Sequence, residues 1–159
     1  MKKTKPVKRP QVGVAVIIRD GKGRILLGKR KNVLNAGLWS LPGGHFEWME
    51  TFSECCRREV REEVGIEIRD LWPVCFTNDM FKKEDRHYVT LFFEAKWFSH
   101  RVTNMEPEKC YGWKWFQPRK IPKNTWHPVR EVVREIENAK QQAQLLVLGE
   151  DDETLEDEA

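Results

Sequence analysis

The sequence predicts an α/β (α+β) fold in which helices pack on a mixed β-sheet. Three observations predict it: two short apolar runs near the N-terminus, an amphipathic helical segment at residues 50–65, and several extended, aromatic-rich segments before a second helical segment. A hairpin followed by a helix, further strands and a last helix is typical of helices packed on a sheet. The sequence contains no internal repeat.

The first two strands are expected at residues 14–19 (VAVIIR) and 24–28 (RILLG), which are rich in β-branched residues and leucine. Residues 20–23 between them include two glycines, which readily take the positive φ of a tight turn. A β-hairpin is therefore predicted. Residues 29–44 are expected to be irregular, and they end in a Pro-Gly-Gly sequence that stops regular structure.

A helix is expected to start near Glu50 or Thr51 and to end at Gly65. Thr51 and Glu54 have the spacing of a capping box, and a glycine just past the last helical residue often ends a helix. Apolar residues recur at helical spacing on one side of this segment. They are Phe52, Cys55, Cys56, Val60 and Val64.

The second half of the chain is expected to contain three more strands and a last helix. The strands are predicted at residues 66–76, 87–98 and 108–116, with a charged loop at residues 82–86. The helix is predicted at residues 127–147, where a proline in the first turn is well tolerated. Its apolar stripe consists of Val129, Val132, Val133 and Ile136.

The length of 159 residues suits one domain with a single core. We expect residues 1–10 to form a basic N-terminal arm, residues 11–140 a folded domain and residues 141–159 an acidic tail. No apolar run approaches the roughly 20 residues that a bilayer requires, and no signal-peptide core follows the basic start, so a cytoplasmic protein is expected. The cysteines form no CxxC pair and are expected to be buried or half-buried thiols rather than zinc ligands. They are Cys55, Cys56, Cys75 and Cys110.

Three glutamates lie within about one turn of the first predicted helix. Glu59 and Glu63 are four residues apart and Glu62 lies beside them, although like charges at this spacing destabilise a helix. One interpretation is that the carboxylates converge on Mg²⁺ or Mn²⁺, which prefer oxygen ligands, with a backbone carbonyl near Gly43 completing the site. The other is an ordinary solvated face on which nearby arginines neutralise the acids. From composition alone both remain open.

Residues 44–66 resemble the Nudix hydrolase signature, G-x5-E-x7-R-E-U-x-E-E-x-G-U, in which U is aliphatic. Every specified position is met, by Gly44, Glu50, Arg58, Glu59, Val60, Glu62, Glu63, Gly65 and Ile66. The segments LLGKRK, LPGGHFE, HYVT and NMEPEKCYGW are similar to small Nudix enzymes that hydrolyse nucleoside triphosphates, including oxidised purine nucleotides. The resemblance covers most of the chain and implies a Nudix fold, with a mixed β-sheet sandwiched between α-helices. Phe46, Trp48 and Met49 depart from the usual opening of that subgroup.

The resemblance also implies a reaction and a set of site residues. A Mg²⁺-dependent (or Mn²⁺-dependent) enzyme would release a nucleoside monophosphate and pyrophosphate. The implied metal ligands are Glu59 and Glu63, assisted by Glu62 and the Gly43 carbonyl, and the implied supporting residues are Arg58 and Glu50. The general base is left open between the cluster and Glu106 or Glu108. The candidate substrate-binding residues are Arg30 for phosphate, and His45, Phe46, Trp48, Thr90 and the aromatic residues near Trp113 and Trp126 for the base.

Two alternatives stay open. One is a Nudix hydrolase of another X-linked diphosphate, such as a nucleotide sugar, a pterin triphosphate or an isoprenoid diphosphate. The other is a non-catalytic module that binds nucleotide or RNA, which the retained carboxylates disfavour. No membrane or nucleic-acid partner is expected, and a homodimer is compatible with the subgroup.

Overall fold

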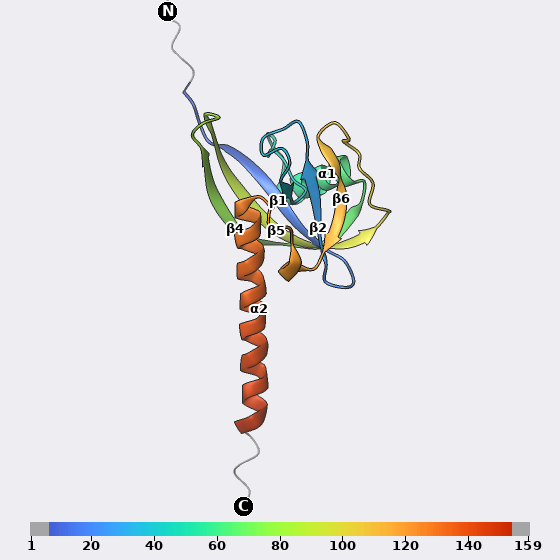
Figure 1. The fold of residues 1–159 in the computed structure, drawn as a ribbon, viewed down its shortest axis with the longest axis vertical. Helices are drawn as coiled ribbons and strands as arrows, with labels where there is room; N and C mark the ends of the chain where they lie inside the picture. The colour runs from blue at the N-terminus through green and yellow to red at the C-terminus, as the bar shows by residue number, and fades with distance from the viewer. Residues whose placement is uncertain (1–6, 154–159) are drawn as a thin grey trace, which may run out of the picture.

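The computed structural model describes residues 7–153, with side chains described for residues 7–144. Figure 1 shows a curved sheet with one short helix packed on it and a second, long helix that extends away from it. The elements are β1 (Gln11–Arg19), β2 (Ile25–Arg30), β3 (Trp39–Ser40), α1 (Phe52–Val64), β4 (Glu67–Phe81), β5 (Arg86–Ser99), β6 (Cys110–Phe116), the 3₁₀ turn η1 (Pro118–Lys120) and α2 (His127–Glu153).

The sheet is mixed, as predicted. Its strand order is β3-β2-β1-β5-β4, and β6 also pairs with β2. β1 runs parallel to β5 over its whole length, whereas its antiparallel pairing with β2 is confined to Arg19 and Ile25 at the closed end of the hairpin. β1 and β2 therefore separate toward their other ends.

The chain segment before α1 fills the space beside β1. The amide of Val14 donates to the Gly44 carbonyl and the amide of Val16 donates to the Pro42 carbonyl, each at 2.9 Å. The Gly43-Gly44 pair is thus held against a central strand of the sheet.

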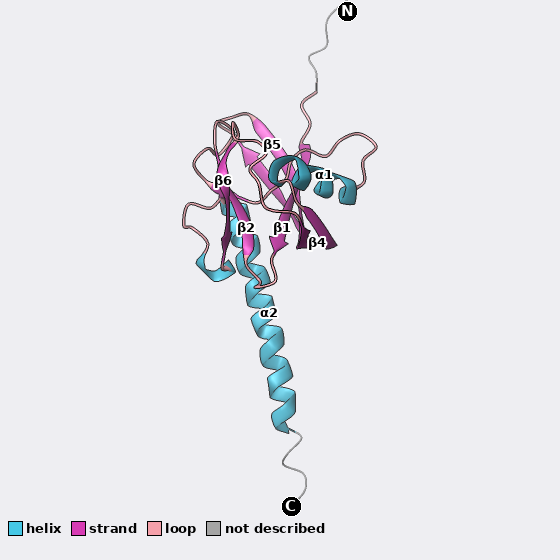
Figure 2. Cartoon of the chain, turned by 90° about the vertical axis from the view of Figure 1, so that its right-hand side faces the viewer, coloured by secondary structure: helices cyan, strands magenta, loops and turns pink. Residues whose placement is uncertain are grey.

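The two helices cover opposite faces of the sheet (Figure 2). Successive side chains of a strand point to opposite faces, and in β1 Val14, Val16 and Ile18 join the core under α1, while Ala15 and Ile17 join the core under α2. The predicted sandwich of a mixed sheet between helices is confirmed.

Helix α1 has the ends that the sequence predicts. Thr51 is the N-cap and forms a complete capping box with Glu54, and Gly65 ends the helix with a left-handed φ of 70°. Phe52 differs from the other apolar residues of the helix, because it is 45% exposed. It lies at the rim of the core, against the rings of Phe46 and Phe93.

Four features differ from the sequence prediction. Residues 39 and 40, in the segment predicted to be irregular, form β3, because they pair with Gly28 and Lys29 of β2. β4 continues to Phe81, because it forms one long hairpin with β5. Cys75 is exposed, unlike the other cysteines, because it lies on an edge strand whose register shifts between Pro73 and Cys75. α2 extends to Glu153, past the predicted helix end at residue 147, and its second half includes the good helix formers Ala, Lys, Gln and Leu.

The predicted arm and tail lie at the two ends of the chain. Most of the basic arm, residues 1–6, and the last part of the acidic tail, residues 154–159, lie outside the described residues. None of the helices that the structure describes has the length and apolar character needed to cross a membrane.

Candidate active site

The carboxylate of Glu59 lies directly against the backbone of Gly44. A Cβ atom placed on Gly44 would lie 2.4 Å from the Glu59 carboxylate carbon and from both of its oxygens. A side chain at position 44 would require the Glu59 carboxylate to move away. The signature glycine therefore has a steric role: it allows the first carboxylate of the cluster to reach the loop beside β1.

The neighbouring residue, Gly43, contacts the third carboxylate of the cluster. Its amide donates a 3.0 Å hydrogen bond to Oε2 of Glu63. The carbonyls of Pro42 and Gly44, on either side, accept hydrogen bonds from amides of β1. The Gly43 carbonyl accepts no hydrogen bond from any described residue. The geometry leaves this carbonyl free to act as an oxygen ligand beside Glu63.

Arg58 organises the acidic residues of the signature. Its guanidinium donates two hydrogen bonds to the Glu50 carboxylate, at 2.7 and 3.0 Å, and one to Oε1 of Glu59 at 2.8 Å. It also reaches Glu62 at 3.2 Å and the carbonyl oxygen of His45 at 3.0 Å. One planar guanidinium thus fixes the helix, the preceding loop and the side chain of Glu59 relative to one another.

The electrostatics separate the carboxyl groups of the site. Hydrogen bonds from Arg58 lower the pKa of Glu50 to about 2, so Glu50 is a permanent anion that holds the arginine. Burial raises the pKa of Glu63 to about 8, and burial also raises the pKa of Glu59 against the opposing effect of Arg58. Glu59 and Glu63 are the carboxyl groups that most need a cation to stabilise their charge.

The donor set suits a hard divalent cation, although the ligands are not gathered around one point. Glu59, Glu62 and Glu63 offer carboxylate oxygens, the type of ligand that Mg²⁺ prefers. Within residues 7–153, however, no three acidic, histidine or cysteine side chains are arranged as a metal site. Arg58 binds Glu59 and Glu62, and the latter is 55% exposed, so a cation would compete with the arginine for these two carboxylates.

A small pocket of about 60 Å³ lies next to Glu63. Arg30 lines it, as do Glu106 and Lys109, which form a 2.7 Å ion pair with each other. Arg30 is held by a 2.7 Å hydrogen bond from its Nε to the Leu34 carbonyl. The structure thus brings together the predicted phosphate-binding arginine and one of the two candidate bases outside the helix. Glu108 does not line this pocket.

Trp113 lines this pocket and contacts the backbone of Glu63. Its indole N–H donates a 3.2 Å hydrogen bond to the backbone carbonyl of Glu63, and its ring packs against the core under α1. Trp115 also packs into that core, while Phe116 packs into the other one. These contacts give Trp115 and Phe116 structural roles in the two cores.

A row of aromatic rings begins at His45, whose backbone carbonyl accepts a hydrogen bond from Arg58. The rings of His45 and Tyr88 are 5.8 Å apart, those of Tyr88 and Phe81 are 6.1 Å apart, and those of Phe81 and Trp126 are 6.3 Å apart and nearly parallel. Thr90 lies two residues after Tyr88 on β5 and is buried. The structure thus places His45, Thr90 and Trp126 in one region.

Thr90 is fixed by a buried acid. Its hydroxyl donates a 2.7 Å hydrogen bond to Oδ2 of Asp79, which also accepts a 2.8 Å bond from Thr77. Asp79 is 9% exposed. A buried carboxylate with hydroxyl partners next to aromatic rings provides polar contacts in an otherwise apolar setting, as in many ligand pockets.

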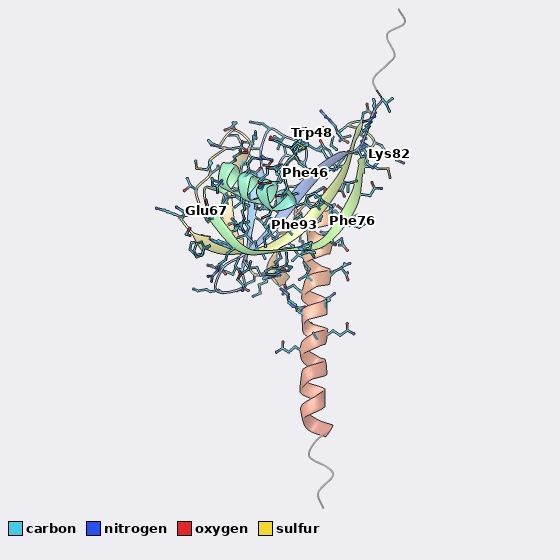
Figure 3. All side chains as sticks on the ribbon, turned by 180° about the vertical axis from the view of Figure 1, so that it is seen from behind. Phe46, Trp48, Glu67, Phe76, Lys82 and Phe93 are labelled. Carbon is cyan, nitrogen blue, oxygen red and sulfur yellow. The ribbon has the colours of Figure 1, made fainter. Side chains whose placement is uncertain are left out.

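Two candidate residues lie elsewhere. Trp48 is 92% exposed at the outer part of its loop, so the structure does not bring it to the other candidates. Phe46, labelled in Figure 3, packs against the core under α1. Its ring centroid is 4.8 Å from that of Phe52. Its apolar side chain is used to anchor the loop.

Four residues of this region were not singled out from the sequence, namely Lys109, Phe81, Tyr88 and Asp79. Lys109 had a local signal, because it follows Glu106 at the spacing of an ion pair. Phe81, Tyr88 and Asp79 meet only through the extended β4–β5 hairpin, whose register places Asp79 opposite Tyr88.

Comparison with known proteins agrees with this arrangement. Residues 9–136 match the model of the NUDIX domain. The chain belongs to this family and is a Nudix hydrolase. The structure of a MutT NUDIX hydrolase from Burkholderia pseudomallei is 31% identical and has a TM-score of 0.75, with 80% of this chain and 98% of that chain covered.

Curated relatives extend the comparison to enzymes that act on RNA. An RNA pyrophosphohydrolase of Francisella philomiragia is 25% identical over 139 residues, which are 77% of this chain and 83% of the relative. An NAD-capped RNA hydrolase, NudC, of Pseudomonas putida is 27% identical over 120 residues, which cover 71% of this chain and 39% of the relative.

Proposed function

We propose that the protein is a Mg²⁺-dependent hydrolase of nucleoside triphosphates, including oxidised or otherwise modified ones, and that it releases a nucleoside monophosphate and pyrophosphate. The observation that carries the proposal is the position of Glu63. It accepts a hydrogen bond from the Gly43 amide, and it lines a pocket that Arg30 also lines. Carboxylates can bind a divalent cation and an arginine can bind phosphate, so the two side by side suit a polyphosphate substrate.

The proposed roles follow from these contacts. Glu59 and Glu63, with the Gly43 carbonyl and assistance from Glu62, would hold Mg²⁺ or Mn²⁺, which would supply neutralisation of phosphate charge and activation of a water molecule. Arg58 and Glu50 keep Glu59 in position. Arg30 binds phosphate, and Glu106, which lines the same pocket, accepts the proton of the attacking water.

The nucleoside would occupy the region of the aromatic row. His45 and Trp126 offer ring faces, and Thr90 with Asp79 offers polar contacts for a base. The observed position of Trp48 gives it no part in this proposal.

The test is a substrate panel. Pyrophosphate release is measured with and without Mg²⁺ for normal and oxidised nucleoside triphosphates and a pterin triphosphate. For nucleotide sugars and isoprenoid diphosphates, which contain no pyrophosphate leaving group, the phosphomonoester products are measured instead. Mg²⁺-dependent release that is confined to nucleoside triphosphates is expected. If the triphosphates are not hydrolysed and another diphosphate is, the proposed substrate class is wrong and the protein is a Nudix hydrolase of that other diphosphate.

A second candidate substrate is the 5′-triphosphate end of an RNA. The observation that favours it is the alignment of most of this chain with RNA pyrophosphohydrolases. It would make nucleic acid a partner, contrary to the expectation from the sequence. Comparing kcat/KM for a free triphosphate and for a triphosphorylated oligoribonucleotide decides between the two. The cytoplasmic location and the possibility of a homodimer remain predictions.

A further inference from the structure

A groove of about 480 Å³ lies at the outer end of the β4–β5 hairpin. It is formed by the hairpin end and by the segment that leads into β1, which lie side by side in Figure 1. Its volume is within the range of about 300–1,000 Å³ that is usual for ligand pockets. It is much larger than the pocket beside Glu63 and shares no lining residue with it.

The groove carries an excess of positive charge. Lys8, Arg9, Lys82 and Arg86 line it together with a single carboxylate, that of Asp85. Lys8 is paired with Asp85. Among the described side chains, the other three cationic groups take part in no ion pair, and they are exposed. Such a groove favours a polyanion, because binding releases the counterions of both partners.

Aromatic rings connect the groove to the candidate active site. Phe81 lines the groove and also contacts Tyr88 and Trp126, and Tyr88 in turn contacts His45, whose carbonyl binds Arg58. Basic side chains that follow a backbone, combined with rings on which bases stack, are the typical elements of a single-strand nucleic-acid site.

We propose that this groove binds the sugar-phosphate backbone of a single-stranded RNA whose 5′-polyphosphate end lies beside Glu63. The proposal rests on the second candidate substrate of the proposed function. Arg9, Lys82 and Arg86 contact phosphates, and Phe81 offers a face to a base. The groove thereby favours a nucleotide chain over a free nucleotide without contacting the reacting phosphates.

The first test measures binding alone. A 12-nucleotide single-stranded RNA with a 5′-hydroxyl end and a 3′ fluorophore is titrated with the full chain by fluorescence anisotropy without Mg²⁺. The double variant Lys82→Ala/Arg86→Ala is compared with Lys22→Ala/Lys120→Ala. The control pair removes two exposed charges beyond the Arg19–Ile25 end of the sheet, whereas the groove lies at its Gln11–Tyr88 end. We expect the first pair to weaken binding about tenfold or more and to reduce the salt slope by about 2, since each lost phosphate contact reduces it by about 1. The control pair should bind as the wild type does.

The result that would overturn the proposal is wild-type protein that binds no RNA, or equal weakening by the two pairs. The proposal would also be overturned if the wild type binds no RNA but sediments with phosphatidylserine vesicles, and the groove variant does not sediment with them. That result would indicate that the groove binds a membrane surface. Because the RNA has no 5′-phosphate, this test is independent of hydrolysis.

A second test separates the groove from the proposed reaction. The groove variant should hydrolyse a free nucleoside triphosphate at the wild-type rate, while its kcat/KM for triphosphorylated RNA falls about tenfold. Unchanged kcat/KM for the RNA would overturn the connection between groove and site. If the wild type hydrolyses neither substrate, the proposed function fails, and RNA binding that depends on Lys82 and Arg86 would still support the groove.

Discussion

Gly44 and the carboxylate of Glu59 are in such close contact that even a methyl group on Gly44 would lie 2.4 Å from the carboxylate carbon. The contact joins the loop beside β1 to helix α1 at the point where the proposed metal ligands lie. It also provides a way to displace one ligand without removing it.

Gly44→Ala should reduce pyrophosphate release about 100-fold, because a displacement of about 1 Å at a catalytic group has effects of that size. Gly21→Ala is the matched control, since a Cβ there meets no atom within 4 Å. Steady-state kinetics of both variants, beside circular dichroism to verify folding, measures the difference. Equal activity of the two variants would show that the position of Glu59 is unimportant.

Mg²⁺ should stabilise the wild-type protein against heat and should not stabilise Glu63→Gln. At a Mg²⁺ concentration about 100 times Kd, binding to the native state adds about 2.7 kcal/mol, which raises Tm by several degrees. Differential scanning fluorimetry with Mg²⁺ and with EDTA measures the shift. Glu67→Gln is the control, because Glu67 pairs with Arg61 on the surface. A full Mg²⁺ shift in Glu63→Gln would place the cation elsewhere.

Trp113→Phe should lower kcat and reduce stability by about 1 kcal/mol, since it removes the hydrogen bond to the Glu63 carbonyl. Trp115→Phe, on the same strand and in the same core, lacks such a bond to the site and should lower stability without a comparable loss of kcat. Urea unfolding and kinetics together distinguish the two. Parallel losses in both variants would argue against a positioning role of Trp113.

Thr90→Val and Thr77→Val should each destabilise the protein by about 1–3 kcal/mol, because each removes a hydroxyl donor from the buried Asp79. Only Thr90→Val should also raise KM for a nucleoside triphosphate, if Thr90 contacts the base as proposed. The comparison of KM in the two variants separates substrate contact from support of Asp79. A similar KM in both would remove Thr90 from the substrate pocket.

Helix α1 shows how much of the site local sequence could predict. The capping box of Thr51 and Glu54, the left-handed Gly65 and the spacing of Glu59 and Glu63 depend on neighbours within a few residues, and the structure has all of them. The packing of Gly44 on Glu59 is not visible in the spacing, because it depends on a loop that lies beside β1 where β1 and β2 separate.

The aromatic row shows what local sequence could not predict. Phe81 and Trp126 are distant in the chain and come together only after the β4–β5 hairpin and the start of α2 are in place. The exposure of Trp48 and Cys75 likewise depends on the path of a loop and on a register shift in an edge strand, neither of which leaves a periodic signal.

The measurement that tests the central claim most directly is Mn²⁺ binding by electron paramagnetic resonance, in which bound ions lose the free-ion signal. Wild type, Glu59→Gln and Glu63→Gln are titrated without substrate, with Glu67→Gln as the control. We predict that wild type and Glu67→Gln bind Mn²⁺ equally, and that each cluster variant binds it at least tenfold more weakly. Equal binding by all four proteins would contradict the assignment of Glu59 and Glu63 as metal ligands.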